Sequence, residues 1–109
     1  MSKNCINIGS FFESNFNSKP VTISGTADGY KLGNICISAC SETEKEVSLD
    51  FIDVLSVSYS TSCAFWDILI NRSSVKISRL LFENLNPTVA ESLEYGYKMI
   101  KNPIGHQVA

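Results

Sequence analysis

Apolar and polar residues follow two periods along this chain, and together they predict strands separated by helices. Residues 47–54 begin with strict alternation, which is typical of a strand, and we expect this strand to be central in its sheet. Within 32–40, apolar residues recur at positions i, i+3, i+4, i+7 and i+8, which is the pattern of a helix face. Asp28 or Thr26 is expected to cap this helix.

A hydroxyl-rich segment, residues 56–62, follows the predicted central strand, and a strongly apolar run then extends to residue 70. The hydroxyls of 58–62 suit a helix N-cap, so we predict a turn followed by a helix that ends near residue 70. The alternative is a further strand, because Phe, Trp and Ile also favour sheets. Trp66 and the phenylalanines are expected to lie in the core.

Another helix is predicted after Asn86, because Asn followed by Pro is a helix-start signal. Its apolar stripe includes Tyr97 but leaves Tyr95 on another face, where an exposed ring would be available to a partner. Glu94 and Lys98 have the spacing of a favourable i,i+4 ion pair.

Shorter patterns complete the expected fold. Residues 5–8 and 20–24 have the pattern of short strands, and 75–82 has that of one bent strand. The phenylalanines between the first two strands are expected in a loop or a single helical turn. The order β-β-α-β-α-β-α predicts a small single-domain α/β protein, with a mixed, mostly parallel β-sheet and about three helices.

Length and composition are those of one globular domain, with 109 residues, 44% of them hydrophobic and 18% charged. We assign the domain to 1–109, with a core at about 5–101 and a flexible tail at 102–109. The net charge of −2 provides no basic field for a nucleic-acid backbone, so no nucleic-acid partner is predicted. Apolar runs are shorter than a membrane span and no secretory signal is visible, so a cytoplasmic protein without membrane association is expected.

The four cysteines, Cys5, Cys36, Cys40 and Cys63, are expected to be buried free thiols, because an aliphatic core makes disulfides unnecessary. Cys36 and Cys40 are four residues apart, which would place two thiolates on one helix face for a metal ion. The single histidine, His106, lies in the tail and no Cys-x-x-Cys occurs, so structural zinc is disfavoured. No metal or other cofactor is predicted.

Few residues are arranged for catalysis, since neither a Ser/His/Asp set nor a Walker-type phosphate loop is present. Asp50 and Asp53 could bind a divalent metal or act in acid–base catalysis, but a carboxylate at a strand end more often stabilises a turn or caps a helix. Gly25 and Gly29 bracket a segment between a strand and a helix. This segment is a candidate anion-binding turn, although a plain turn is favoured.

The hydroxyl-rich segment has a structural and a functional interpretation. In the structural interpretation it is a helix cap and a solvated turn. In the functional interpretation it receives a phosphate, because backbone N–H groups and the helix dipole stabilise negative charge at a helix N-terminus. A phosphate adds about −1.5 to −2 charges and would change any protein interface built on this turn.

Over residues 25–100 the chain resembles the STAS-like family, the compact α/β domains related to bacterial anti-sigma-factor antagonists. The motifs that carry the resemblance are Val-Ser-Leu-Asp-Phe at 47–51 with Val54, the hydroxyl-rich segment, the apolar helix, Leu81-Phe82 with 84–87, the last helix, and Gly25 with 28–32. The Asp-Ser-Ser-Gly signature of the phospho-switched antagonists is replaced by 58–61 or 59–62. The region 60–64 also lacks the acidic residues of the Ser-Phe-hydrophobic-Glu-Glu pattern of uncharacterised STAS-like proteins.

The resemblance implies a non-enzymatic regulatory domain that binds a GHKL-type ATPase or kinase, or another protein of a signalling complex. The partner would dock on the turn and the helix after it, with Tyr59, Cys63 and Asp67 as contact residues. Four hydroxyls would be phosphoacceptor candidates, Ser60 and Thr61 first, then Ser58 and Ser62.

Two other classes of function stay open. A small inhibitor or accessory protein of phage or mobile-element type would use the fold as a rigid wedge against a protein target, and the Asn/Ser/Ile-rich composition is compatible with it. An enzyme that uses Asp50 and Asp53 with a metal, or the turn at Gly25 with a nucleotide, is less favoured. Edge strands at 5–8 or 75–78 could pair between chains, so a monomer or weak homodimer is expected.

Overall fold

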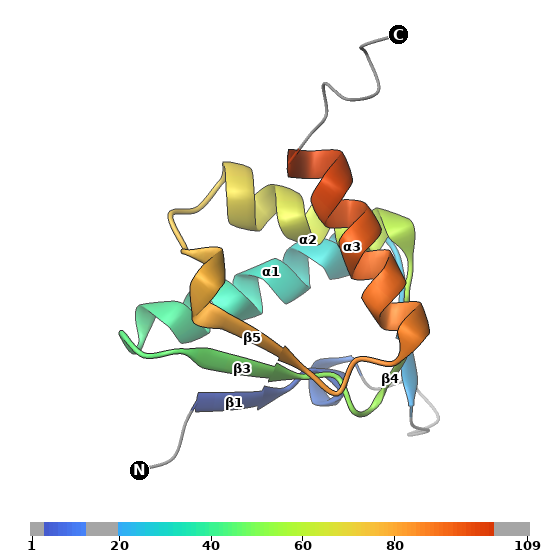
Figure 1. Ribbon diagram of the computed structural model, residues 1–109, viewed down its shortest axis with the longest axis horizontal. Helices are drawn as coiled ribbons and strands as arrows, with labels where there is room; N and C mark the ends of the chain where they lie inside the picture. The colour runs from blue at the N-terminus through green and yellow to red at the C-terminus, as the bar shows by residue number, and fades with distance from the viewer. Residues whose placement is uncertain (1–3, 13–19, 102–109) are drawn as a thin grey trace, which may run out of the picture.

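The fold is α/β, as the alternation of sequence patterns predicts. The computed structural model describes residues 4–12 and 20–101, and within them three α-helices lie on one side of a three-stranded sheet, beside a two-stranded sheet (Figure 1). The strands are β1 (Asn4–Asn7), β2 (Val21–Ile23), β3 (Val47–Asp50), β4 (Val54–Val57) and β5 (Leu80–Glu83). The helices are α1 (Thr26–Ser41), α2 (Tyr59–Asn71), α3 (Pro87–Lys101) and the short 3-10 helices η1 (Ile8–Phe11) and η2 (Ile77–Arg79).

All strand pairings among the described residues are parallel, which confirms the predicted pairing type. β3 lies between β1 and β5, so its predicted central position is also confirmed; Leu49, for example, is in register with Ile6 and Phe82. One sheet was expected, but β2 and β4 pair with each other in a second sheet. Helices that cover one side of parallel strands bury the apolar side chains on that side.

The predicted strand over 47–54 is wrong in its second half. β3 ends at Asp50, whose Oδ1 accepts a hydrogen bond from the N–H of Ile52 at 3.0 Å. The N–H of Val54 then donates to the carbonyl of Phe51 at 3.0 Å. These two bonds close a tight turn, and an aspartate side chain is well suited to hold such a turn. The hydroxyl-rich segment therefore does not follow the central strand but begins in the last residues of β4 and continues into α2.

The predicted bent strand over 75–82 is also wrong in its first half, which contains η2. Arg79, the last residue of η2, donates from Nη2 to the carbonyls of Cys40, Thr43 and Lys45. These carbonyls lie at and just beyond the C-terminal end of α1, where backbone acceptors lack partners within the helix. We attribute the local helical turn to this docking of the guanidinium group.

Helices α2 and α3 begin where the sequence predicts. The Oγ of Ser58 caps α2 by accepting from the N–H of Thr61 at 3.1 Å, so the alternative of a strand here is wrong. The Oδ1 of Asn86 accepts from the N–H of Val89 at 2.8 Å at the start of α3. In both cases a short polar side chain satisfies a backbone donor of the first turn.

The helices approach one another closely at glycines of α1 and α3. A Cβ on Gly29 of α1 would lie 2.6 Å from the Cβ of Ala64 in α2. A Cβ on Gly96 of α3 would lie 2.7 Å from the backbone carbonyl carbon of Ser62, also in α2. Helix α2 is thus held between α1 and α3, and the missing side chains of these glycines allow the close approach.

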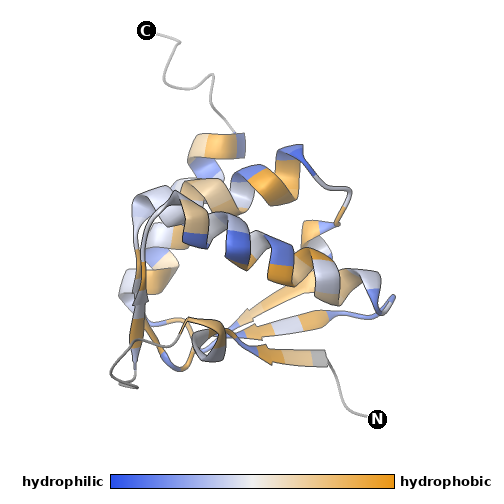
Figure 2. Cartoon of the chain, turned by 180° about the vertical axis from the view of Figure 1, so that it is seen from behind, coloured by the Kyte–Doolittle hydropathy of each residue, from blue (hydrophilic) through white to orange (hydrophobic). Residues whose placement is uncertain are grey.

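The core lies between this helix layer and the sheets. The largest fully buried side chains are Phe51, Phe65, Ile8, Ile23, Leu32, Leu49 and Leu69. Trp66 is also buried, as expected, and its Nε1 donates to the carbonyl of Leu93 at 2.8 Å. Phe11 is the exception to the expected aromatic core, because 43% of it is exposed. Figure 2 shows the hydrophobic colouring along the strands of the three-stranded sheet.

Some sequence predictions fall outside these elements. Phe16, His106 and the tail at 102–109 lie outside the described residues. Residues 75–78, proposed as an edge strand for pairing between chains, form no strand, and β5 is the sheet edge on that side. None of the described helices is long and apolar enough to span a membrane.

Candidate interaction surface at the first turn of α2

The hydroxyl groups of the first turn of α2 form one connected network. Thr61 Oγ1 donates to the carbonyl of Gly25 at 2.8 Å, so its only proton is used there. Ser58 Oγ lies 2.8 Å from Thr61 Oγ1 and must therefore donate to it. Ser58 Oγ also accepts from the N–H of Gly25 at 3.3 Å, and Ser60 Oγ lies 3.1 Å away. The network ties the N-terminal ends of α1 and α2 together.

Two of the four phosphoacceptor candidates lie inside the protein. Thr61 and Ser62 both have no exposed surface. Ser62 Oγ donates to the carbonyl of Ser92 in α3 at 2.7 Å, at the close contact with Gly96. Their hydroxyls satisfy buried carbonyls, and a kinase could reach them only after local unfolding.

Ser60 is the accessible candidate. It is exposed at the second position of α2, while Ser58 is half-buried as the N-cap. The backbone N–H groups at the first positions of a helix have no partner within the helix, and the helix dipole is positive there. The burial of Thr61 and Ser62 therefore leaves Ser58 and Ser60 as the phosphoacceptor candidates with exposed surface, and Ser60 is the more exposed of the two.

Tyr59 forms an exposed aromatic pair with Tyr95 of α3. The ring centroids are 4.3 Å apart and the planes are inclined by 30°, so the rings stack. Tyr59 is 51% exposed and Tyr95 40%, whereas Tyr97 packs edge-on against Trp66 with centroids 5.1 Å apart. The predicted exposure of Tyr95 and the predicted packing of Tyr97 on the apolar side of the helix are thereby confirmed. We call Tyr59, Ser60 and Tyr95 the α2 surface.

Three shallow hollows surround the α2 surface. One of about 310 Å³ lies beside Ser60, and its lining includes Thr26 and Cys63. The other two, of about 260 and 230 Å³, are both lined by Tyr59 and Glu91. Hollows of this size beside exposed aromatic rings suit side chains of a protein partner better than a whole cofactor.

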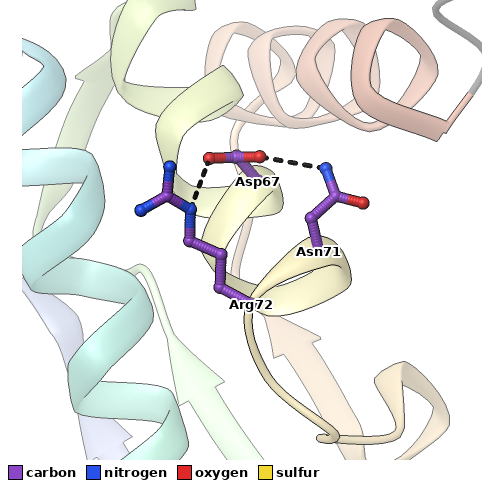
Figure 3. A network of polar contacts seen from close by, with 3 residues as sticks. All are labelled: Asp67, Asn71 and Arg72. Carbon is purple, nitrogen blue, oxygen red and sulfur yellow. Dashed lines mark hydrogen bonds and ion pairs between the residues drawn. The ribbon is translucent and has the colours of Figure 1, made fainter.

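The remaining predicted contact residues lie on the next turns of α2. Cys63 is half-buried, and burial raises the pKa of its thiol. Asp67 accepts from Nδ2 of Asn71 at 2.9 Å and forms an ion pair with Nε of Arg72 at 3.4 Å (Figure 3). The guanidinium of Arg72 also lies over the ring of Tyr30, 5.8 Å from its centroid. Asp67 is thus engaged within the protein, at the edge of the α2 surface.

The segment from Gly25 to Gly29, a candidate anion-binding turn, is not a turn but the N-cap and first residues of α1. Gly25, with a φ of 96°, is the N-cap of α1, and its N–H already donates to Ser58 Oγ. Gly29 lies inside the helix at the close contact with α2. The predicted caps Thr26 and Asp28 also lie within the helix, and no side chain caps it. These glycines are explained by the positive φ and by the helix contact.

The candidate metal ligands are not brought together. Within residues 4–12 and 20–101, no group of three His, Cys, Asp or Glu side chains could hold a metal ion. Asp50 Oδ1 accepts from Asn84 Nδ2 at 2.8 Å as well as from its own turn, and Asp53 Oδ2 accepts from Asn7 Nδ2 at 3.2 Å. Both carboxylates therefore stabilise the carboxyl ends of strands and the turns that follow.

Sequence reasoning missed the pairing of Tyr59 with Tyr95 and the position of Glu91 between the two smaller hollows. Glu91 is exposed and has no ion pair with a described residue, whereas Glu94 pairs with Lys98 at 3.0 Å, as predicted. The one available signal was the predicted exposure of Tyr95. The sequence does not show which residue of α2 Tyr95 contacts, because that depends on how α2 and α3 cross.

No protein-family model, curated protein or solved structure matches this chain.

Proposed function

We propose that this protein is a cytoplasmic, non-enzymatic regulatory domain of the STAS-like type, which binds a protein partner through the α2 surface. The partner is a GHKL-type ATPase or kinase, and phosphorylation of Ser60 releases it. The observation that carries the proposal is the position of one exposed hydroxyl, Ser60, next to the exposed stacked pair of Tyr59 and Tyr95.

The chemistry of the α2 surface supports binding of a protein. Tyrosine rings provide a large contact area with few rotatable bonds, and they are enriched among residues that dominate interface energies. The two rings already stack on each other, so little conformational freedom is lost when a partner covers them. An exposed pair of this kind on two different helices has no role in the core.

The position of Ser60 supports a phosphate switch. Since the first helical N–H groups lack partners within α2, a phosphate on Ser60 would gain hydrogen bonds from the backbone without disturbing the fold. At the same time it would place about −1.5 to −2 charges beside Tyr59, in the middle of the contact area. A partner that fits the neutral surface would then have to bury this charge, which is costly.

The purified protein should be tested against each purified GHKL-type ATPase of the same organism, with Mg²⁺ and ATP. We expect one of them to bind the unmodified chain in calorimetry and to phosphorylate Ser60, as mapped by mass spectrometry. Ser60→Glu should weaken binding at least tenfold. Ser78→Glu, which changes an exposed serine on η2, is the matched control and should bind like the wild type.

Equal binding by the wild type, Ser60→Glu and Tyr59→Ala would contradict the assignment of the surface. If binding depends on Tyr59 but not on a charge at Ser60, the α2 surface is the binding site and the phosphate switch is refuted. Failure of every GHKL-type ATPase to bind would refute the proposed partner class.

A further inference from the structure

β1 is an edge of the three-stranded sheet, and among the described residues only β3 pairs with it. Its other side therefore presents backbone N–H and C=O groups with the spacing of a strand. Protein edges are commonly covered, and Asn86 Nδ2 donates to two carbonyls of β4, those of Val54 and Leu55, at 3.2 and 3.0 Å. On β1 the carbonyl of Asn7, the last residue of the strand, accepts from Ser10 Oγ at 2.7 Å. β1 reads Asn-Cys-Ile-Asn, with neither the Lys nor the Pro that often protects an edge.

An open groove of about 750 Å³ lies beside this strand, between β1, η1 and α1. Apolar side chains form much of its wall: Ile6, Phe11, Ile35 and Ala39. Phe11 is 43% exposed although it is a large aromatic residue. Seen from behind, α1 lies above β1 and η1 (Figure 2). A free strand edge beside an apolar helix face is the arrangement in which extended peptides add to a sheet.

Two opposite charges, one in α1 and one at its C-cap, define the length and direction of the groove. Lys31 and Glu42 both line it, and neither forms an ion pair with a described residue. Nζ of Lys31 donates to the carbonyl of Phe11 at 2.8 Å, which places this lysine at the end of η1, the 3-10 helix that follows β1. Eleven helical residues span roughly 16 Å at 1.5 Å per residue. That is the length of about five extended residues at roughly 3.3 Å each.

We propose that an extended segment of about five residues from a partner protein adds as a strand to the free edge of β1 and packs against the apolar face of α1. Backbone hydrogen bonds to β1 hold the segment, and alternate apolar side chains enter the groove. Charge complementarity places an acidic residue or a chain-terminal carboxylate beside Lys31 and a basic residue beside Glu42. The groove shares no residue with the α2 surface, so the proposal does not depend on the proposed function.

Selection of displayed random heptapeptides on the full-length protein tests the proposal. We expect enriched peptides with alternating apolar residues between an acidic and a basic residue. In fluorescence anisotropy, Ser38→Arg should weaken their binding at least tenfold, because Ser38 is exposed and lines the groove. Ser78→Arg on η2 is the matched control and should leave binding unchanged. Lys31→Glu should select peptides with the opposite charge at that end.

Hydrogen exchange distinguishes strand addition from other uses of the groove. The bound peptide should slow deuterium exchange of the outward-facing β1 amides, because they become hydrogen-bonded. Peptide binding that is sensitive to Ser38→Arg but leaves these amides unprotected would overturn strand addition. If no enriched peptide loses binding in Ser38→Arg, the groove is not a peptide-binding site and the proposal is refuted. A concentration-dependent dimer that Ser38→Arg dissociates would assign the edge to a second copy of this chain and would also contradict the proposal.

Discussion

The first turn of α2 has an inner and an outer side with similar residues in opposite environments. On the inner side, Thr61 and Ser62 are fully buried and donate to the carbonyls of Gly25 and Ser92. On the outer side, Tyr59 and Ser60 are exposed, and Tyr59 stacks on Tyr95. Four consecutive residues are therefore divided between holding the helices together and forming a surface.

Neighbouring hydroxyl residues in one sequence segment can therefore have different roles, some in stability and others in binding. Buried hydroxyls complete the hydrogen bonding of the helix junction, so their loss should reduce the free energy of unfolding. The exposed residues contribute little to that free energy and are available to a partner. Substitutions on the two sides should therefore separate stability from binding.

The largest change in the free energy of unfolding is expected at Gly29 of α1, which faces the inner side of the first turn of α2 and leaves no room for a side chain. Gly29→Ala should reduce the free energy of unfolding by about 3 kcal/mol, because the new methyl group would overlap α2 at Ala64 and at the carbonyl of Thr61. Chemical denaturation measures the change. Asn34→Ala, an exposed position on the same helix, is the control and should be neutral within about 0.5 kcal/mol. A loss below 1 kcal/mol for Gly29→Ala would mean that the helices separate easily.

The thiols show a similar contrast: Cys36 and Cys40 are buried, whereas Cys5 is exposed, so the expectation that all four thiols are buried is wrong. Burial, and secondarily the neighbouring thiolate of Cys40, raises the pKa of Cys36 to about 12. In the unfolded chain this thiol loses its proton near pH 9, so its contribution to stability is complete below pH 9 and is lost as the pH rises toward 12. Between pH 9 and 11 the loss should be on the order of 2 kcal/mol, because each unit of pH within this window changes the free energy by about 1.36 kcal/mol.

The measurement for Cys36 is denaturation of the wild type and Cys36→Ala at several alkaline pH values. The difference between the two proteins isolates the thiol from the titration of lysines and tyrosines. An identical pH dependence in both proteins would show that the buried thiol is accessible to water.

A smaller effect is expected from the buried hydroxyl itself. Thr61→Val keeps the shape of the side chain but leaves the carbonyl of Gly25 and the hydroxyl of Ser58 without this partner. We expect a loss of about 1–2 kcal/mol in the free energy of unfolding. Ser60→Ala, one residue earlier on the outer side, should cost less than about 0.5 kcal/mol. Equal losses for the two variants would remove the distinction between inner and outer hydroxyls.

The smallest effect is expected for the exposed ring pair. A double-mutant cycle of Tyr59→Ala and Tyr95→Ala should give a coupling energy of about 0.5–1 kcal/mol in unfolding, since exposed stacked rings contribute little. The same two variants should impair binding of the proposed partner far more than they impair folding. A coupling energy above 2 kcal/mol would instead make the pair a structural element.

Sequence patterns predicted individual elements well where the signal was local. Ser58 and Asn86 are short polar caps ahead of helices, and such caps act on residues three positions away. The turn at Asp50 escaped prediction because its carboxylate bonds the backbone of Ile52 within an otherwise apolar run. The helical turn before β5 escaped because it depends on carbonyls almost forty residues away, which Arg79 contacts.

The candidate site was predicted less completely than the fold. The sequence located it at 58–62, but it did not distinguish the buried hydroxyl of Thr61 from the exposed one of Ser60. That distinction depends on which face of α2 meets α1 and α3. The glycines at 25 and 29 showed the same limitation, since a helix contact and an anion-binding turn both favour glycine.

The sequence by itself determined the α/β class, the central position of the third strand and the starting points of two helices, because periodicity and capping are local properties. Only the tertiary contacts explain the helical turn before β5, the division of the hydroxyls and the stacking of Tyr59 on Tyr95. These features depend on contacts between segments distant in the chain, where the packing of α2 between two glycine-bearing helices determines which side chains are enclosed.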